Sequence, residues 1–223
     1  VLQAMAGVKL ELVSRISELE SVLLRFLAHG DLQLQNRALD AIFNTRKYGS
    51  ALSSQWKGRL KNLLNDNLFR EELTALTSES ESLPHVVHWR GLLAPLIVRI
   101  LFGRFIARKG SASGRHSLPL RRKMIMSCFG AWDQGSLVLI VDFLLESLKG
   151  NSIKQQLGFL NVLGDVFGSL GRKLDEVSMN RLIQSLIDIN EGVSVNDEEV
   201  EEEEDEVKTE EVELEISNGA DQG

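Results

Sequence analysis

The spacing of apolar residues constrains this chain more than any other feature. Between residues 8 and 28, apolar side chains recur at every third or fourth position, which is the periodicity of an amphipathic helix. They are Leu12, Val13, Ile16, Leu19, Val22, Leu23, Phe26 and Leu27. Similar patterns recur along the chain, and Leu dominates an apolar content of 43% with only three prolines among 223 residues. This profile predicts an all-α fold.

Start and stop residues divide the pattern into separate helices. Gly30 is a helix stop and Asp31 a cap for the next helix, so two antiparallel helices form a hairpin. Asp66, Asp133 and Asp175 are expected to cap later helices. The remaining helices are expected over 52–64, 68–76, 84–108 with a kink at Pro95, from Pro119 through Phe129, 134–149, 152–170 and 175–190.

Stacked helix pairs explain this arrangement best. About nine helices in pairs of roughly 40 residues have the spacing of a HEAT/armadillo-type α-solenoid segment. We expect helical repeats over 1–78, helices with a basic Gly/Ser loop (109–117) over 84–131, further repeats over 133–190, and an acidic tail over 191–223. The tail has too few apolar residues to offset its ordering entropy, so we expect it to be disordered. It acts as a solvated spacer, competes with RNA for basic residues, or binds histones or ribosomal proteins.

No residue pattern indicates an enzyme. His85 and His88 have an H-x-x-H spacing, but no acid lies between Ser82 and Trp132, and the chain contains no CxxC or HExxH motif, so we expect no metal. Cys128 lies on an apolar helical face, which favours a buried thiol over a nucleophile. The GSASG sequence lacks the Gly-Lys-Ser/Thr end of a phosphate-binding loop. We therefore expect no catalytic residues, no cofactor and no small-molecule substrate.

Three further features bound the environment of the chain. Trp56, Trp89 and Trp132 lie on or next to helices, where core packing is favoured over base stacking. A single cysteine suits a reducing compartment, and no apolar run approaches the roughly 20 residues needed to cross a bilayer, so we expect no membrane contact. The sequence has no initiator methionine and is expected to be the interior of a longer protein.

Charge is divided unevenly along the chain. Residues 1–192 carry 24 Lys+Arg against 18 Asp+Glu, whereas residues 193–223 carry one Lys against 14 acids. The segment 82–132, here called the basic stretch, holds nine Lys+Arg and no acid. Such a cluster around a Gly/Ser loop suits nucleic-acid phosphates or another acidic partner. The candidate contact residues are Arg104, Arg108, Lys109, Arg115, Arg121, Arg122 and Lys123.

A structural explanation of the basic stretch remains open beside the RNA hypothesis. Arg104 and Arg108 fall at a predicted helix C-terminus, where the helix dipole stabilises cations. The other cations could pair with acids from adjoining repeats.

Two segments resemble a known family. They are NLLNDNLFREELTAL (Asn62–Leu76) and HWRGLLAPLIVRILFGRFIARKGSASGRHSLPLRRKMIMSCF (His88–Phe129), and they resemble the down-regulated-in-metastasis family, also called the U3 small nucleolar RNA-associated protein 20 family. The most specific part is LAPLIVRILFGR, Leu93–Arg104, followed by a basic Gly/Ser loop and an Arg-rich restart. Phe102 stands where many relatives have Tyr, and the loop sequence differs. The similarity covers roughly residues 20–150.

The resemblance implies a function that the periodicity and charge do not. It implies a very large nuclear and nucleolar HEAT solenoid, a scaffold of the small-subunit processome in ribosomal RNA processing. The implied partners are pre-ribosomal RNA or U3 small nucleolar RNA, processome proteins and adjoining repeats of the same long chain. The alternative is a HEAT-repeat adaptor that binds acidic peptides and no RNA.

Overall fold

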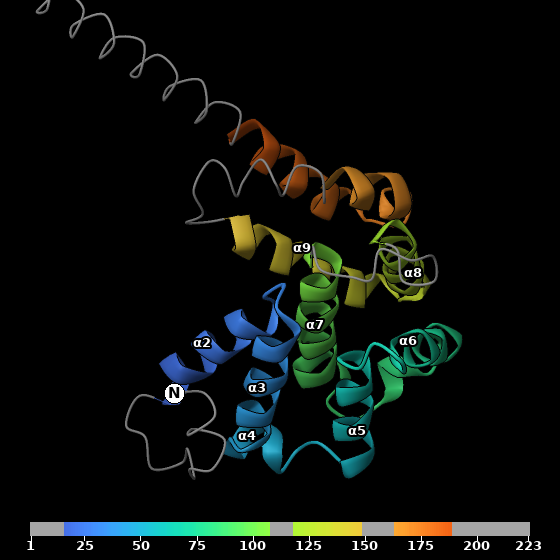
Figure 1. Cartoon of the computed structure of the whole chain (residues 1–223). Helices are drawn as coiled ribbons and strands as arrows, with labels where there is room; N and C mark the ends of the chain where they lie inside the picture. The colour runs from blue at the N-terminus through green and yellow to red at the C-terminus, as the bar shows by residue number, and fades with distance from the viewer. Residues whose placement is uncertain (1–15, 108–117, 149–162, 189–223) are drawn as a thin grey trace, which may run out of the picture.

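The computed structural model describes residues 16–107, 118–148 and 163–188, and all secondary structure in these ranges is helical. The all-α prediction is confirmed (Figure 1). The elements are α2 (Ile16–Leu27), α3 (Leu32–Phe43), α4 (Arg46–Gly49), α5 (Ser54–Leu63), α6 (Phe69–Ser78), η2 (Leu83–His85), η3 (Trp89–Leu93), α7 (Ala94–Ile106), α8 (Leu118–Ala131), α9 (Gln134–Leu148), and helices over 163–170 and 176–188.

Helix α7 is the central element of the described structure. It contacts α2, α3, α5, α8 and α9, and it runs between them in Figure 1. Ten of its 13 residues are buried. The segment is apolar on nearly every side, so it is stable only where neighbours surround it, as its sequence predicts.

The predicted caps at three helix starts are confirmed. The Asp31 carboxylate accepts hydrogen bonds from the amides of Gln33 and Leu34 at 2.8 and 3.1 Å. Asp133 accepts from the Ser136 amide at 3.2 Å at the start of α9, and Asp175 from the Ser178 amide at 2.7 Å. Each aspartate carboxylate therefore accepts from amides of the first helical turn, which have no partner four residues earlier in the helix.

The expected cap at Asp66 is wrong. Helix α6 begins after Leu68, which makes no capping bond through its side chain. The turn is closed instead by Asn65, whose carbonyl oxygen accepts from the amides of Leu68 and Phe69 at 3.1 and 2.8 Å. The Asp66 carboxylate is thus available to an arginine of α7, Arg104, whose Nη2 lies 2.5 Å from Asp66 Oδ1.

The single helix expected over 84–108 is wrong at its N-terminal end. The segment folds as a 3-10 turn (η2), a π-helical turn (η3) and then α7, with His88 between the first two at φ 62°. Pro95 lies in the first turn of α7. The π-helical turn runs directly into α7, with the Ala94 amide donating to the Trp89 carbonyl oxygen, so a wider turn immediately precedes the proline, which has no amide to donate.

A close helix crossing explains a glycine of the family-like segment. A Cβ atom on Gly103 would lie 2.5 Å from the His29 carbonyl oxygen and closer still to Gln35 Nε2. Gln35 is 1% exposed, and its amide donates to the carbonyl oxygens of Leu27 at 2.7 Å and Ile100 at 3.1 Å. This buried amide joins α7 to the α2–α3 hairpin, and the joint requires glycine at position 103.

The tryptophans lie in or against the core, which confirms the packing prediction. Trp89 and Trp132 are 2% and 4% exposed, and their ring centroids lie 5.3 Å apart in an edge-to-face arrangement. Trp56 is partly buried 6.2 Å from Trp89. Trp89 Nε1 donates to Ser136 Oγ at 3.0 Å, so its polar group is satisfied.

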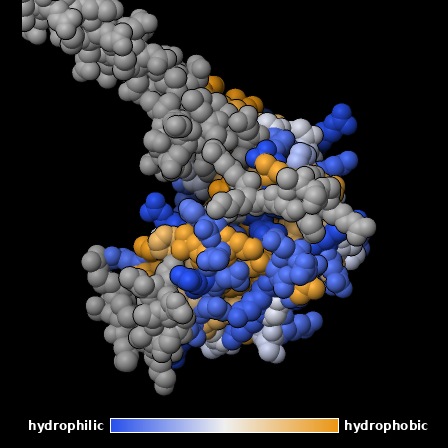
Figure 2. Space-filling view, in the orientation of Figure 1, coloured by the Kyte–Doolittle hydropathy of each residue, from blue (hydrophilic) through white to orange (hydrophobic). Residues whose placement is uncertain are grey.

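The coloured part of the face drawn in Figure 2 is mostly polar. Hydrophilic side chains dominate the face drawn in Figure 2, around an apolar area near its centre. Within the described ranges, no helix combines the length and the hydropathy that a bilayer span requires. The predicted Gly/Ser loop (109–117), the acidic tail (191–223) and Arg108 lie outside the described residues.

Candidate functional site

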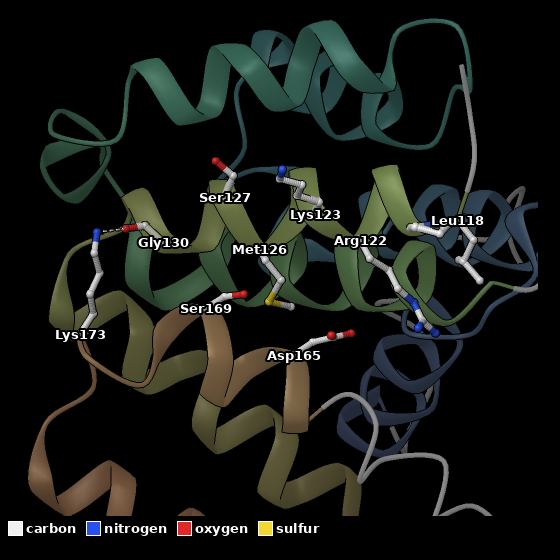
Figure 3. A pocket seen from close by; sticks show the side chains of 10 residues that line it. Leu118, Arg122, Lys123, Met126, Ser127, Gly130, Asp165, Ser169 and Lys173 are labelled. Carbon is white, nitrogen blue, oxygen red and sulfur yellow. Dashed lines mark hydrogen bonds between the residues drawn. The ribbon is translucent and has the colours of Figure 1, made fainter. Parts of the chain in front are cut away.

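A groove runs between α8 and the helix over 163–170 (Figure 3), and we call it the α8 groove. Its volume is about 710 Å³. The residues that line it are Leu118, Pro119, Arg122, Lys123, Met126, Ser127, Gly130, Asp165, Ser169 and Lys173. One wall is the Arg-rich helix that restarts after the Gly/Ser loop, so the groove lies where the sequence places part of its basic stretch.

The charges around the α8 groove are mainly positive. Among the described lining residues, Arg122, Lys123 and Lys173 are accompanied by one carboxylate, Asp165. Lys123 is exposed and forms no ion pair within the described ranges. Lys173 donates through Nζ to the Gly130 carbonyl oxygen and still carries two further ammonium protons (Figure 3). The groove therefore has positive charge for an acidic ligand.

Arg122 is anchored against the end of α7. Its Nε donates to the Phe105 carbonyl oxygen at 3.2 Å, and its guanidinium lies 4.8 Å from the centre of the Phe105 ring. The carbonyl is at the C-terminal end of α7, where the helix dipole favours a cation. Arg122 therefore has a structural role and also contributes charge to the groove.

Arg104 lies inside the protein and connects three elements. It is 5% exposed, its Nη2 lies 2.5 Å from Asp66, and its guanidinium carbon lies 4.7 Å from the centre of the Phe69 ring. These contacts join α7 to the α5–α6 connection and to α6. The guanidinium therefore contributes to packing as well as to an ion pair.

Arg121 is buried in the same region. Its Nη2 donates to the Ala107 carbonyl oxygen at 2.6 Å, and the residue is 7% exposed. Burial first, and then the nearby charge of Arg104, lower the pKa of the Arg121 guanidinium. The contact secures α8 to the end of α7.

Four of the seven predicted contact residues are described, and the structure separates them. Lys123 is exposed, Arg122 is half buried, and Arg104 and Arg121 are buried. Arg108, Lys109 and Arg115 lie outside the described residues. Of these four described residues, the α8 groove brings together Arg122 and Lys123.

Acids from elsewhere in the chain pair with other cations of the basic stretch. Arg90 Nη2 lies 2.5 Å from Asp133 Oδ2, and Arg99 Nη2 lies 3.2 Å from Glu146 Oε2. For Asp133, burial opposes the charged form, but hydrogen bonds from Ser136 and Arg90 outweigh it and lower the carboxyl pKa. Arg90 and Arg99 therefore have acidic partners within this chain.

The other wall of the α8 groove has no sequence signal. Lys173, Asp165 and Ser169 come from a segment about 40 to 50 residues beyond Arg122 and Lys123. Neither their spacing nor their local charge is unusual. Only the packing of the helix over 163–170 near α8 brings them to the groove (Figure 3).

The residues considered for catalysis differ in their exposure to solvent. His85 and His88 are exposed, and the described residues contain no group of three or more His, Cys, Asp or Glu able to hold a metal ion. Cys128 is buried, which confirms its predicted environment, and burial raises its pKa to about 11. At neutral pH the thiol is therefore protonated and a poor nucleophile.

Comparison with known proteins identifies the family. The sequence profile described as "U3 small nucleolar RNA-associated protein 20, N-terminal" matches residues 9–217. The U3 small nucleolar RNA-associated protein 20 of Schizosaccharomyces pombe is 24% identical over 193 residues, covering 75% of this chain. Its Saccharomyces cerevisiae counterpart is 32% identical over 88 residues, covering 40% of this chain.

The matched regions amount to 8% and 3% of these two relatives, so the chain spans a small part of their length. The profile match, in contrast, extends over nearly the whole chain and includes both family-like segments. The chain belongs to the U3 small nucleolar RNA-associated protein 20 family.

Proposed function

We propose that this chain is a non-enzymatic scaffold segment of a nucleolar ribosome-biogenesis factor. The observation that carries the proposal is the family match over residues 9–217. The names of the relatives state an association with U3 small nucleolar RNA. By this relationship the chain is part of the small-subunit processome and acts in pre-ribosomal RNA processing through RNA and protein contacts. Its helix pairs belong to a HEAT/armadillo-type solenoid that continues in adjoining repeats.

Among the seven predicted contact residues, we assign RNA contact to the one that is exposed and to the three that lie outside the described residues. Lys123 is exposed at the α8 groove, and Arg108, Lys109 and Arg115 precede it in the sequence. Among the described residues, the groove lining includes no aromatic side chain that could stack on a base. Contact through phosphates, with little dependence on base sequence, fits these residues best.

A charge-reversal experiment on the parent protein tests the RNA contact. One variant replaces Arg108, Lys109, Arg115 and Lys123 with Glu. The control reverses four arginines that are exposed on other helices, and they are Arg25, Arg37, Arg46 and Arg70. Arg104 and Arg121 stay unchanged because their replacement would disturb buried contacts.

Ultraviolet crosslinking to RNA and a salt titration are the two measurements. We expect the first variant to lose most crosslinks from this segment, with a salt slope smaller by up to about 3 to 4 because each phosphate contact contributes about 0.9. The control should change both quantities little. Equal RNA binding by the first variant and the unchanged protein would refute the assignment.

The α8 groove also supports the adaptor alternative. Leu118, Pro119 and Met126 lie between its cations, and an acidic peptide with apolar residues could use both features. If nuclease treatment removes RNA from the purified parent complex and bound acidic proteins remain, protein binding accounts for the groove. If they dissociate together with the RNA, the RNA-dependent scaffold is supported.

A further inference from the structure

The α8 groove has two chemical requirements for an occupant. Leu118, Pro119 and Met126 supply apolar surface, while Arg122, Lys123 and Lys173 outnumber Asp165 in charge. Its volume of about 710 Å³ lies within the roughly 300–1,000 Å³ typical of ligand pockets, which is enough for a few side chains. A suitable occupant must therefore be short, partly apolar and acidic.

Hydrogen-bonding groups add a third requirement. Ser127 and Ser169 line the same groove, one from each wall. Each hydroxyl can donate and accept, so the pair can serve the amide and carbonyl groups of a peptide backbone. A peptide thus fits this lining better than a hydrocarbon ligand, which would leave the hydroxyls without partners.

One segment of this chain has the required composition. Residues 210–216 read EEVELEI, in which Val212, Leu214 and Ile216 alternate with acids. Alternate side chains of an extended peptide point to opposite sides, so this sequence can present one apolar edge and one acidic edge. The segment also falls within the family match, which reaches residue 217.

The connection between groove and segment is long enough. Lys173 lies just before the helix over 176–188, whose 13 residues span about 20 Å at 1.5 Å per residue. The 21 residues from 189 to 209 have a root-mean-square length of roughly 25 Å if flexible, and charge repulsion extends such chains. A linker whose length matches the span gives an effective concentration in about the millimolar range.

We propose that residues 210–216 dock in the α8 groove of the same chain. The apolar edge covers the Met126 side of the groove, and the glutamates pair with Lys123 and Lys173. Docking occupies Lys123, so an external polyanion must displace the segment before it reaches this cation. The docking itself requires no RNA, and it therefore goes beyond the proposed function.

Zero-length crosslinking on the full chain tests the docking directly. A carbodiimide joins lysine ammonium groups to carboxylates that contact them, and mass spectrometry identifies the joined peptides. We expect crosslinks from Lys123 or Lys173 to Glu210, Glu211, Glu213 or Glu215, reduced severalfold in high salt. Crosslinks of these lysines only to 197–206, or to no residue of the tail, would overturn the proposal.

A peptide competition distinguishes docking from general charge. The probe is a fluorescent peptide of residues 208–218, titrated with the full chain and followed by anisotropy. One variant replaces the four glutamates at 210, 211, 213 and 215 with Gln, and the matched control replaces Glu201, Glu202, Glu203 and Glu204 with Gln. Both variants lose four charges from the tail.

The docked segment competes with the probe, so removing it should strengthen probe binding. If the probe binds with Kd near 0.1 mM, an effective concentration of about 1 mM predicts roughly tenfold tighter binding to the 210–215 variant. The 201–204 control should shift the affinity less than twofold, and Lys123→Glu should weaken probe binding in every background. Equal shifts in the two Gln variants would refute docking at a specific segment.

RNA binding by the same variants separates this inference from the proposed function. Crosslinks to residues 210–216 without any RNA contact support docking and refute the RNA assignment. RNA contact without crosslinks to residues 210–216 supports the RNA assignment and refutes docking.

Discussion

Replacing Gly103 with Ala places a methyl group where α7 crosses the α2–α3 hairpin. The new Cβ would lie 2.5 Å from the His29 carbonyl oxygen, 2.9 Å from Gln35 Cδ and closer still to Gln35 Nε2. One neighbour is backbone, and the other is a buried amide with two acceptors, so neither can move without loss. The helices must separate or the Gln35 amide must leave its site.

Three contributions determine how much Gly103→Ala lowers the free energy of unfolding. Losing the bonds from Gln35 to Leu27 and Ile100 costs about 1 kcal/mol each. Overpacking at a close crossing adds about 1–3 kcal/mol, whereas the helix propensity of Ala over Gly returns about 1 kcal/mol. We therefore expect Gly103→Ala to lower the free energy of unfolding by about 2–4 kcal/mol.

Equilibrium urea denaturation of the full chain, followed by circular dichroism, measures this change through the midpoint at constant m-value. Gly58→Ala in α5 is the matched control, because a Cβ there meets nothing within 4 Å. We expect that control to be neutral or to stabilise by up to about 1 kcal/mol. Equal midpoints for the two alanine variants would refute the close-crossing argument.

Three other predictions concern charged and titratable groups. Arg104→Ala should lower the free energy of unfolding by about 1–3 kcal/mol in urea denaturation, because it removes buried packing and the partner of Asp66. Lys123→Ala should change the free energy of unfolding by less than about 0.5 kcal/mol. Similar values for the two variants would contradict the assigned burial. Asp133→Asn keeps a capping oxygen but loses the ion pair. Because the pKa of Asp133 is lowered in the folded state, its carboxylate stabilises the fold above its ordinary pKa of 3.8, and this stabilisation is lost as pH falls through the folded pKa. The difference in free energy of unfolding between wild type and Asp133→Asn should therefore close below about pH 3.8. A difference independent of pH would refute this. Cys128 should resist iodoacetamide at neutral pH until urea unfolds the chain, because burial raises its pKa to about 11; labelling of the native chain at the rate of a free thiol would contradict it.

Most helices could be predicted because their signals are local. Asp31, Asp133 and Asp175 cap the residues that immediately follow them, and the apolar content of α7 indicates burial without knowledge of its neighbours. The prediction at Asp66 was wrong because an aspartate that is an equally plausible cap can pair with a distant cation instead. Asp66 pairs with Arg104, 38 positions away. The role of Pro95 was hard to predict for a similar reason. Whether a proline lies at a helix start or in a helix interior depends on how the residues before it fold.

The candidate site was less predictable than the fold. Arg104 and Lys123 belong to one basic stretch, yet one is buried against Asp66 and the other is exposed at the α8 groove. A count of charges cannot separate them, because burial depends on which helix covers each side chain. The family, in contrast, could be recognised from the sequence alone, by the residues of short segments and by the order in which these segments follow one another.

By itself, the sequence determined the helical class, three of the caps, the family and the excess of positive charge before the tail. The tertiary structure decided which cations are available, because the acids that pair with Arg90 and Arg99 lie 43 and 47 positions away. It also decided that a Cβ at position 103 would overlap with His29 and Gln35, and that a second helix completes the α8 groove. Helix periodicity and caps depend on neighbours within about four residues, whereas ion pairing and burial depend on contacts that only packing creates.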